Sequence, residues 1–202
     1  MKKIILLVLT AAFAGFAFAE KDKNAETYKL SKEASKVEWT GKKVTGQHSG
    51  NISIEESELL VKNGIIESGT IIFDMTSITC NDMQGEMSEK LVNHLKSDDF
   101  FSVEKFKTAT FKIKSVKPLK VEEEGKANQT ITGDLTIKGI THEISFPAMV
   151  SFKNGKMVAI GEATVDRSKF DVRFGSPSFF QNIGDKAIYD DFTLNFKLAA
   201  KR

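Results

Sequence analysis

Apolar and polar residues alternate with a period of two along most of the chain, and turn-forming Gly, Asn and Asp separate the alternating runs. This period places successive side chains on opposite faces of a β-strand. In one such run Ile144 and Phe146 share a face opposite Glu143, and in the last run Phe192 and Leu194 share a face. The pattern predicts eight strands, at 36–42, 48–56, 65–74, 109–117, 128–137, 141–152, 156–166 and 187–198.

Three short sequences have the composition of tight hairpin turns. They are centred on Asn63-Gly64, Lys138-Gly139 and Asn154-Gly155, and Asn-Gly supplies the positive φ angles that such turns need. We place the first between the second and third strands, and expect antiparallel neighbours at each. Eight strands with one dry face are typical of a sandwich or a closed barrel, and the hairpin connections favour the barrel. The prediction is an all-β fold, an eight-stranded antiparallel barrel.

One segment departs from the strand pattern. From Gly85 onward, Met87, Leu91 and Leu95 recur at every fourth position, which is typical of a short amphipathic helix. This helix falls between the third and fourth predicted strands, and we expect it to lie across one end of the barrel. Phe100, Phe101 and Phe106 follow it closely, and three aromatic rings in so short a stretch indicate packing against a core or a ligand.

The amino terminus is typical of a signal peptide. Lys2 and Lys3 precede an apolar run, which ends in the small-residue pattern Ala17-Phe18-Ala19. The run is shorter than the roughly 18–20 residues of a membrane-spanning helix, so we expect cleavage after Ala19, a mature chain that does not span a membrane, and a periplasmic or secreted location. A single domain then occupies 20–202. The two lysines account for the net charge of +2, so the charge of the remainder does not indicate nucleic-acid binding.

The chain contains few residues of the types that carry out catalysis. Cys80 is the only cysteine, and we interpret it as a small apolar filler, with a redox or cross-linking thiol as the alternative. No nucleophile elbow, phosphate loop or nucleotide fingerprint is present. The sequence therefore predicts a protein that is not an enzyme and has no cofactor, while the residues leave a homodimer open.

Seven phrases together resemble the YceI-like family of exported, lipocalin-like proteins. They occur in the family's order and extend over nearly all of the predicted mature chain. The phrases are VEWTGKK at 37–43, HSG at 48–50, IFDMTSI at 72–78, LKSDDFF at 95–101, TATF at 108–111, TGDLTIKGIT at 132–141 and VDRSKF at 165–170. The resemblance implies a lipocalin-like barrel whose long apolar interior holds a polyisoprenoid or a similar amphiphile, such as a lipid with a quinone-like head.

Apolar side chains on the predicted strands are the candidates for the wall of such an interior. From their spacing alone, they either fill one another as a core or line a channel, and the resemblance favours a channel. The predicted lipid-binding residues are Trp39, Phe73, Phe101, Phe106, Phe111, Ile113, Ile144, Phe146, Phe192, Leu194 and Phe196.

Polar candidates for the mouth of the channel are fewer. His48 and His94 form a candidate pair for a lipid head group, and the alternative function is a periplasmic metal-dependent enzyme or metal-binding protein that uses both. No local spacing of His or Cys fixes a metal site. Arg167 has Asp166, Asp171 and Arg173 close by. This segment is either a solvated or mutually paired turn, or Arg167 or Arg173 binds an anionic head group.

Overall fold

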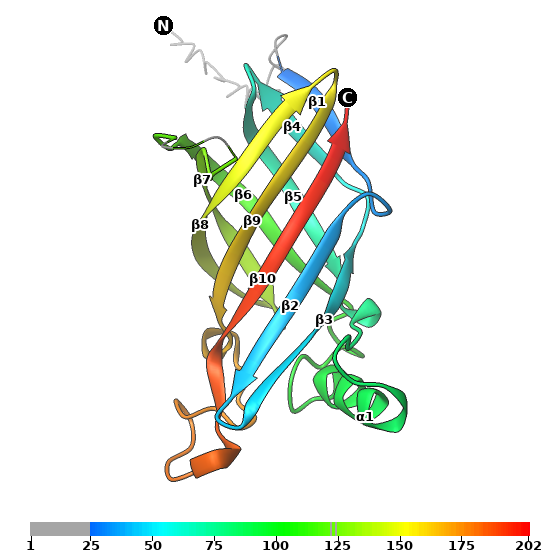
Figure 1. Cartoon of the computed structure of the whole chain (residues 1–202), viewed down its shortest axis with the longest axis vertical. Coiled ribbons are helices and arrows are strands. Elements are labelled where there is room, and N and C mark those ends of the chain that lie inside the picture. The colour runs from blue at the N-terminus through cyan, green and yellow to red at the C-terminus, as the bar shows by residue number, and fades with distance from the viewer. Residues whose placement is uncertain (1–24, 122, 124) are drawn as a thin grey trace, which may run out of the picture.

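The structure is a computed structural model, and it describes residues 25–121, 123 and 125–202 (Figure 1). The predicted signal peptide at 1–19 lies outside the described residues. The strand segments are β1 (Ala25–Leu30), β2 (Lys36–Lys43), β3 (Gly46–Ile54), β4 (Glu58–Lys62), β5 (Ile65–Asp74), β6 (Thr108–Pro118), β7 (Gln129–Ile137), β8 (Ile140–Lys153), β9 (Lys156–Asp166) and β10 (Ile188–Lys201). The helices are α1 (Gly85–Lys96) and three 3₁₀ turns, η1 (Met75–Ser77), η2 (Arg167–Phe170) and η3 (Gly184–Lys186).

These ten segments form one closed antiparallel barrel of eight strands within the described chain. β1 and β2 follow each other along the same edge of β10, where Leu30 pairs with Ala200 and Lys36 pairs with Lys197. β3 and β4 follow each other along β5 in the same way. Each pair of segments is therefore one barrel strand with a short interruption, and the predicted all-β, eight-stranded fold is confirmed.

The predicted bounds of the first two strands were wrong. The first barrel strand begins at Ala25 and not at 36, and the second ends at Lys62 after a break at 55–57. The Asn63-Gly64 turn therefore joins β4 to β5. β4 has only five residues, and two polar glutamates, Glu55 and Glu56, separate it from β3. A segment this short carries too few alternations to be recognised by its period.

The three predicted turns adopt the backbone that their sequences favour. Asn63 and Gly64 have φ of 52° and 75°, and Asn154 and Gly155 have φ of 51° and 69°. Lys138 and Gly139 follow the same pattern between β7 and β8, with φ of 52° and 75°. Two consecutive positive φ angles match the right-handed twist of the flanking strands. These turns therefore help to fix the register of the barrel.

The two ends of the barrel differ. At one end, which we call the hairpin end, lie the β4–β5 and β8–β9 turns and the C-terminus (Figure 1). At the other, which we call the helical end, lie α1, η2 and the segment 171–187 (Figure 1). α1 follows the third barrel strand, as predicted. Its Met87 is 64% exposed, so only part of the predicted apolar face is covered. Among the described helices, none is long and apolar enough to cross a membrane.

Toward the helical end, the pairing between β8 and β9 stops before either strand ends. β8 and β9 pair from Lys153↔Lys156 to Ala148↔Gly161 and no further. The next β8 residue is Pro147, which has no N–H to donate. Beyond this point Phe170 of η2 is buried, with its ring 5.3 Å from that of His142 on β8. The 3₁₀ turn after β9 thus covers the interior near the end of the ladder.

Candidate functional site

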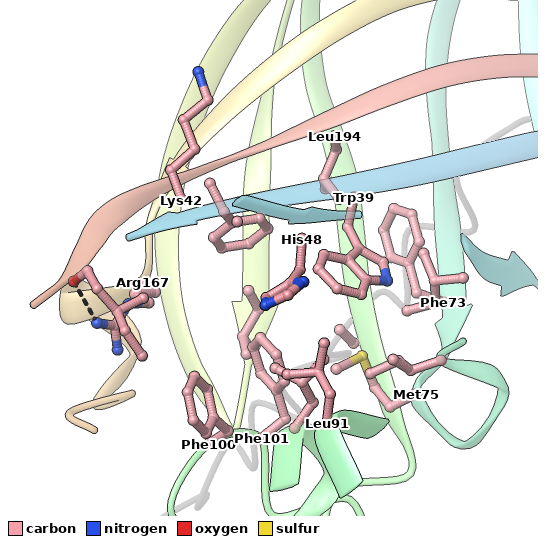
Figure 2. A pocket seen from close by; sticks show the side chains of 18 of the residues that line it. Trp39, Lys42, His48, Phe73, Met75, Leu91, Phe100, Phe101, Arg167 and Leu194 are labelled. Atoms are coloured by element: carbon pink, nitrogen blue, oxygen red, sulfur yellow. Dashed lines mark hydrogen bonds between the residues drawn. The ribbon is translucent and has the colours of Figure 1, made fainter. Parts of the chain in front are cut away.

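The interior of the barrel contains two adjacent cavities. The larger, cavity 1, has a volume of about 150 Å³ and lies at the helical end. Its wall combines strand residues with residues of α1, η1, η2 and the loop at 97–107 (Figure 2). Apolar side chains make up most of this wall, among them Trp39, Ile52, Phe73, Met75, Leu91, Leu95, Phe100, Phe101, Phe192 and Leu194.

The smaller, cavity 2, has a volume of about 60 Å³ and lies deeper in the barrel, where strands alone form its wall. Three residues, Phe73, Leu135 and Leu194, line both cavities. The ring of Phe146 lies 5.3 Å from that of Phe111 and 5.5 Å from that of Phe196 in cavity 2. Every residue of this wall is apolar. Because the two cavities meet at three shared apolar side chains, we refer to them together as the apolar path.

Ten of the eleven predicted wall residues line a cavity. Trp39, Phe101 and Phe192 line cavity 1, and Phe73 and Leu194 line both. The members at cavity 2 alone are Phe111, Ile113, Ile144, Phe146 and Phe196. Phe106 lines neither cavity, and its ring lies instead against Gly139 in the β7–β8 turn.

Several wall residues were not singled out from the sequence. Met75 and Ile78 follow β5, and Leu91 and Leu95 belong to α1. Their positions depend on how these non-strand segments fold over the barrel end. A period-two pattern carries no information about such a contact. By contrast, Leu135 occupies a buried position in the regular alternation of β7. The period-two pattern could therefore have identified it as a wall residue.

Trp39 is held in the wall by a contact between distant segments. Its indole Nε1 donates a hydrogen bond to the carbonyl oxygen of Thr79 at 3.1 Å. That carbonyl lies directly over Gly50 on β3, where an added Cβ would come within 1.8 Å of the oxygen. Because only glycine leaves this space, Gly50 allows Thr79 to reach the indole. The phrases around Trp39 and Gly50 thus meet in one structural unit.

His48, one of the predicted head-group residues, lines cavity 1. Its Nδ1 lies 2.8 Å from Asp82 Oδ2. The other carboxylate oxygen of Asp82 accepts hydrogen bonds from Ser49 N–H at 2.8 Å and Cys80 Sγ at 3.3 Å. Although burial acts in the opposite direction, the hydrogen bonds from Ser49, His48 and Cys80 lower the pKa of Asp82 to about 2. The carboxylate is therefore ionised at neutral pH and fixes the imidazole ring.

His94 occupies a different environment. Its ring packs edge-on between Phe100 and Phe174, at centroid distances of 4.9 and 4.4 Å. Its Nε2 lies 3.4 Å from Asp99 Oδ2, and it does not line either cavity. His48 and His94 each have an aspartate partner of their own. Within the described ranges, no group of three or more His, Cys, Asp or Glu side chains is placed to hold a metal ion.

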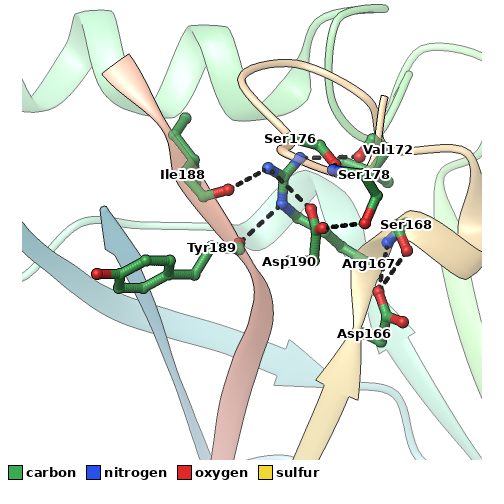
Figure 3. Close-up of polar contacts among 9 residues, drawn as sticks. All are labelled: Asp166, Arg167, Ser168, Val172, Ser176, Ser178, Ile188, Tyr189 and Asp190. Atoms are coloured by element: carbon green, nitrogen blue, oxygen red, sulfur yellow. Dashed lines mark hydrogen bonds and ion pairs between the residues drawn. The ribbon is translucent and has the colours of Figure 1, made fainter. Parts of the chain in front are cut away.

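Arg167 is buried, with 4% of its surface exposed, so the solvated turn expected there was wrong. Its Nε donates to the carbonyl of Tyr189 at 3.1 Å, and its two terminal nitrogens donate to those of Val172 at 2.8 Å and Ile188 at 2.9 Å (Figure 3). Asp190 Oδ1 lies 3.6 Å from the guanidinium. Burial lowers the pKa of Arg167, whereas Asp190 and Asp166 raise it.

These bonds give Arg167 a structural role at the helical end. They join η2 to the start of β10, and the guanidinium also lies 5.8 Å from the centre of the Phe100 ring. The Arg167 side chain also borders cavity 1. Most of its N–H groups already have acceptors within the protein. Arg173, its neighbour, pairs with Asp171 as expected for a mutually paired turn.

The fold and its two apolar cavities define a lipocalin-like β-barrel. The family described as the YceI-like domain matches residues 28–200, and the chain belongs to this family. The predicted family is therefore confirmed.

Relatives in sequence and in structure agree with this assignment. A UPF0312 protein of Staphylococcus aureus (strain USA300) is 33% identical over 129 residues, which cover 60% of this chain and 68% of the relative. BcnA of Burkholderia cenocepacia has a similar structure, with a TM-score of 0.64 at 21% identity over 85% of this chain and 99% of that one. A domain from Saccharophagus degradans, described as polyisoprenoid-binding, has a TM-score of 0.59 at 11% identity over 86% and 97%.

Proposed function

We propose that this protein is an exported carrier that holds the apolar chain of an isoprenoid-like amphiphile inside the barrel. The observation that carries the proposal is the apolar path through the interior, made of cavities of about 150 and 60 Å³ that share Phe73, Leu135 and Leu194. Apolar cavities of about 150 Å³ lined by aliphatic and aromatic side chains stay dry and bind hydrocarbon molecules. A hydrocarbon chain fits this chemistry, because it needs no hydrogen bonds.

The hydrophobic effect favours an apolar chain in this path. Each methylene group that leaves water contributes about 0.8 kcal/mol. A chain that occupies both cavities has to displace the shared side chains, Phe73, Leu135 and Leu194. All three lie beside empty space, and we infer that a change in their rotamers opens the path.

Two further observations support the proposal. A solved relative of similar fold is described as a polyisoprenoid-binding domain. The amino-terminal sequence has the features of a signal peptide, and a lipid carrier is useful in an aqueous compartment next to a membrane. The chemistry of the wall supports binding and not turnover, since nearly all of it is apolar.

The direct test is mass spectrometry under native conditions on the protein purified after export by its own host. We expect an additional mass that disappears on organic extraction and corresponds to an isoprenoid lipid. A matched pair of variants checks where it binds. Ala109→Leu fills cavity 1 and should reduce the bound fraction, whereas Lys112→Leu places the same side chain at an exposed position of the same strand and should not.

The proposal is wrong if the exported protein carries no lipid and also fails to bind added farnesol. It is also wrong if Ala109→Leu and Lys112→Leu retain the same amount of lipid, because the lipid would then bind outside the barrel.

A further inference from the structure

One polar side chain is aimed into cavity 1, whose wall is mostly apolar. The His48 ring projects from β3 toward the centre of the cavity, beside Trp39 and above Phe101 (Figure 2). Two of the three other cationic groups of this wall are directed elsewhere. The side chain of Lys42 points away from the cavity (Figure 2), and Arg167 donates to three backbone carbonyls. The third, Lys43, is the last residue of β2 and borders the cavity.

The orientation of the His48 ring is fixed by its partner. Asp82 accepts from Nδ1 at 2.8 Å, and Ser49 N–H and Cys80 Sγ hold the carboxylate in turn. An ionised carboxylate only accepts hydrogen bonds, so Nδ1 carries a proton. In the neutral ring Nε2 is then a bare acceptor. Across the described residues, no hydrogen bond or ion pair involves His48 Nε2.

The charge of this pair selects among head groups. When the imidazole is in its neutral form, it and the ionised Asp82, whose Oδ2 lies 2.8 Å from Nδ1, together carry one negative charge. This charge opposes a phosphate or carboxylate at Nε2 and favours a neutral group that donates a hydrogen bond. A hydroxyl group on the end of an apolar chain has this property.

We propose that His48 Nε2, oriented by Asp82, accepts a hydrogen bond from the hydroxyl group of a neutral amphiphile whose apolar chain fills the barrel. This inference rests on the proposed function and names the class of its ligand, a long-chain alcohol or a hydroquinone with an isoprenoid tail. His48 is the residue that contacts the ligand, and Asp82 is a positioning residue.

Three probes of the same chain length test the inference. Farnesol donates a hydrogen bond, farnesyl methyl ether only accepts one, and farnesyl phosphate is anionic. Trp39 is the only tryptophan of the chain and lines cavity 1, so its fluorescence reports occupancy. At neutral pH we expect farnesol to bind about three- to tenfold more tightly than the ether, the size of one hydrogen bond, and more tightly than the phosphate.

The variants separate a hydrogen bond from a structural effect. His48→Leu should abolish the preference for farnesol over the ether while both still bind. Asp82→Asn should also abolish it, because an amide can donate to Nδ1 and so move the ring proton to Nε2. His142→Leu is the control, since this histidine lies outside both cavities, and it should keep the preference.

The possible failures are distinguishable. If farnesol and its ether bind the unchanged protein equally, the inference is overturned and the carrier proposal stands. If farnesyl phosphate binds most tightly and His48→Leu removes that advantage, the site takes an anionic head group, which also overturns the inference. If none of the three probes binds, the proposed function fails and the inference fails with it.

Discussion

Cavity 1 and cavity 2 lie in the same barrel but are built from different parts of the chain. Strand residues alone surround cavity 2, and all of them are apolar. Cavity 1 also takes residues from α1, η1, η2 and the loop after α1, and it contains His48 and Arg167. Alternating apolar residues on strands are sufficient to enclose an apolar cavity. To hold a polar side chain such as His48 in a fixed orientation, the protein uses a residue outside the strands, Asp82.

The largest expected effect follows from removing the buried cation at the helical end. Arg167→Met leaves the carbonyls of Val172, Ile188 and Tyr189 without their donor. It also leaves the partly buried Asp190 beside an apolar group. We expect the free energy of unfolding to fall by about 3–5 kcal/mol, as measured by urea denaturation.

The control for this change is Arg173→Met, at an exposed position six residues along the chain. Its expected cost is at most about 1 kcal/mol, as for other surface ion pairs. Equal costs for the two variants would mean that Arg167 does not organise the helical end.

A smaller effect is expected at the contact between Gly50 and Thr79. Gly50→Ala forces a Cβ against the Thr79 carbonyl that accepts from Trp39, and we expect a loss of about 1–3 kcal/mol. Gly41→Ala is the matched control on the adjacent strand β2, because an added Cβ there meets nothing within 4 Å. A Trp39 emission spectrum should shift for the first variant only. If both variants behave alike, the close approach at Gly50 is not important for the wall of cavity 1.

The smallest effect concerns how the free energy of unfolding changes at acid pH. The pKa of Asp82 is lowered from 3.8 to about 2 in the folded protein. A lowered pKa means that its stabilising contribution is complete above pH 4 and is lost as the pH falls through about 2. We therefore expect the unfolding free energy of the unchanged protein to fall more steeply between pH 4 and pH 2 than that of Asp82→Asn. Parallel curves for the two proteins would contradict this assignment.

The sequence was informative where side-chain direction follows from local period. Phe111, Phe146 and Phe196 were correctly placed inside because each lies in a regular alternating strand. The Asn-Gly turns were correct for the same local reason. These features fix most of cavity 2, which strands alone enclose.

The sequence was less informative where distant segments meet. Asp82 was not identified as the partner of His48, since 34 residues separate them and Asp82 lies in no recognisable motif. Arg167 has charged neighbours in sequence, which suggested a solvated turn, and only the packing of η2 against β10 explains its burial. Phe106 was misplaced because an irregular loop has no period from which to read its direction. These failures all concern the helical end.

The most direct test of the central claim, that the two cavities are one site for a single chain, is a series of prenols of increasing length. Geraniol, farnesol and geranylgeraniol should bind the unchanged protein with increasing affinity by Trp39 fluorescence, because each added unit buries more apolar surface. Ala163→Leu narrows cavity 2 and should remove most of the gain from the longest chain. Thr164→Leu, at the neighbouring exposed position, should keep it. An affinity that does not depend on chain length, or a gain that Ala163→Leu leaves intact, would contradict the account.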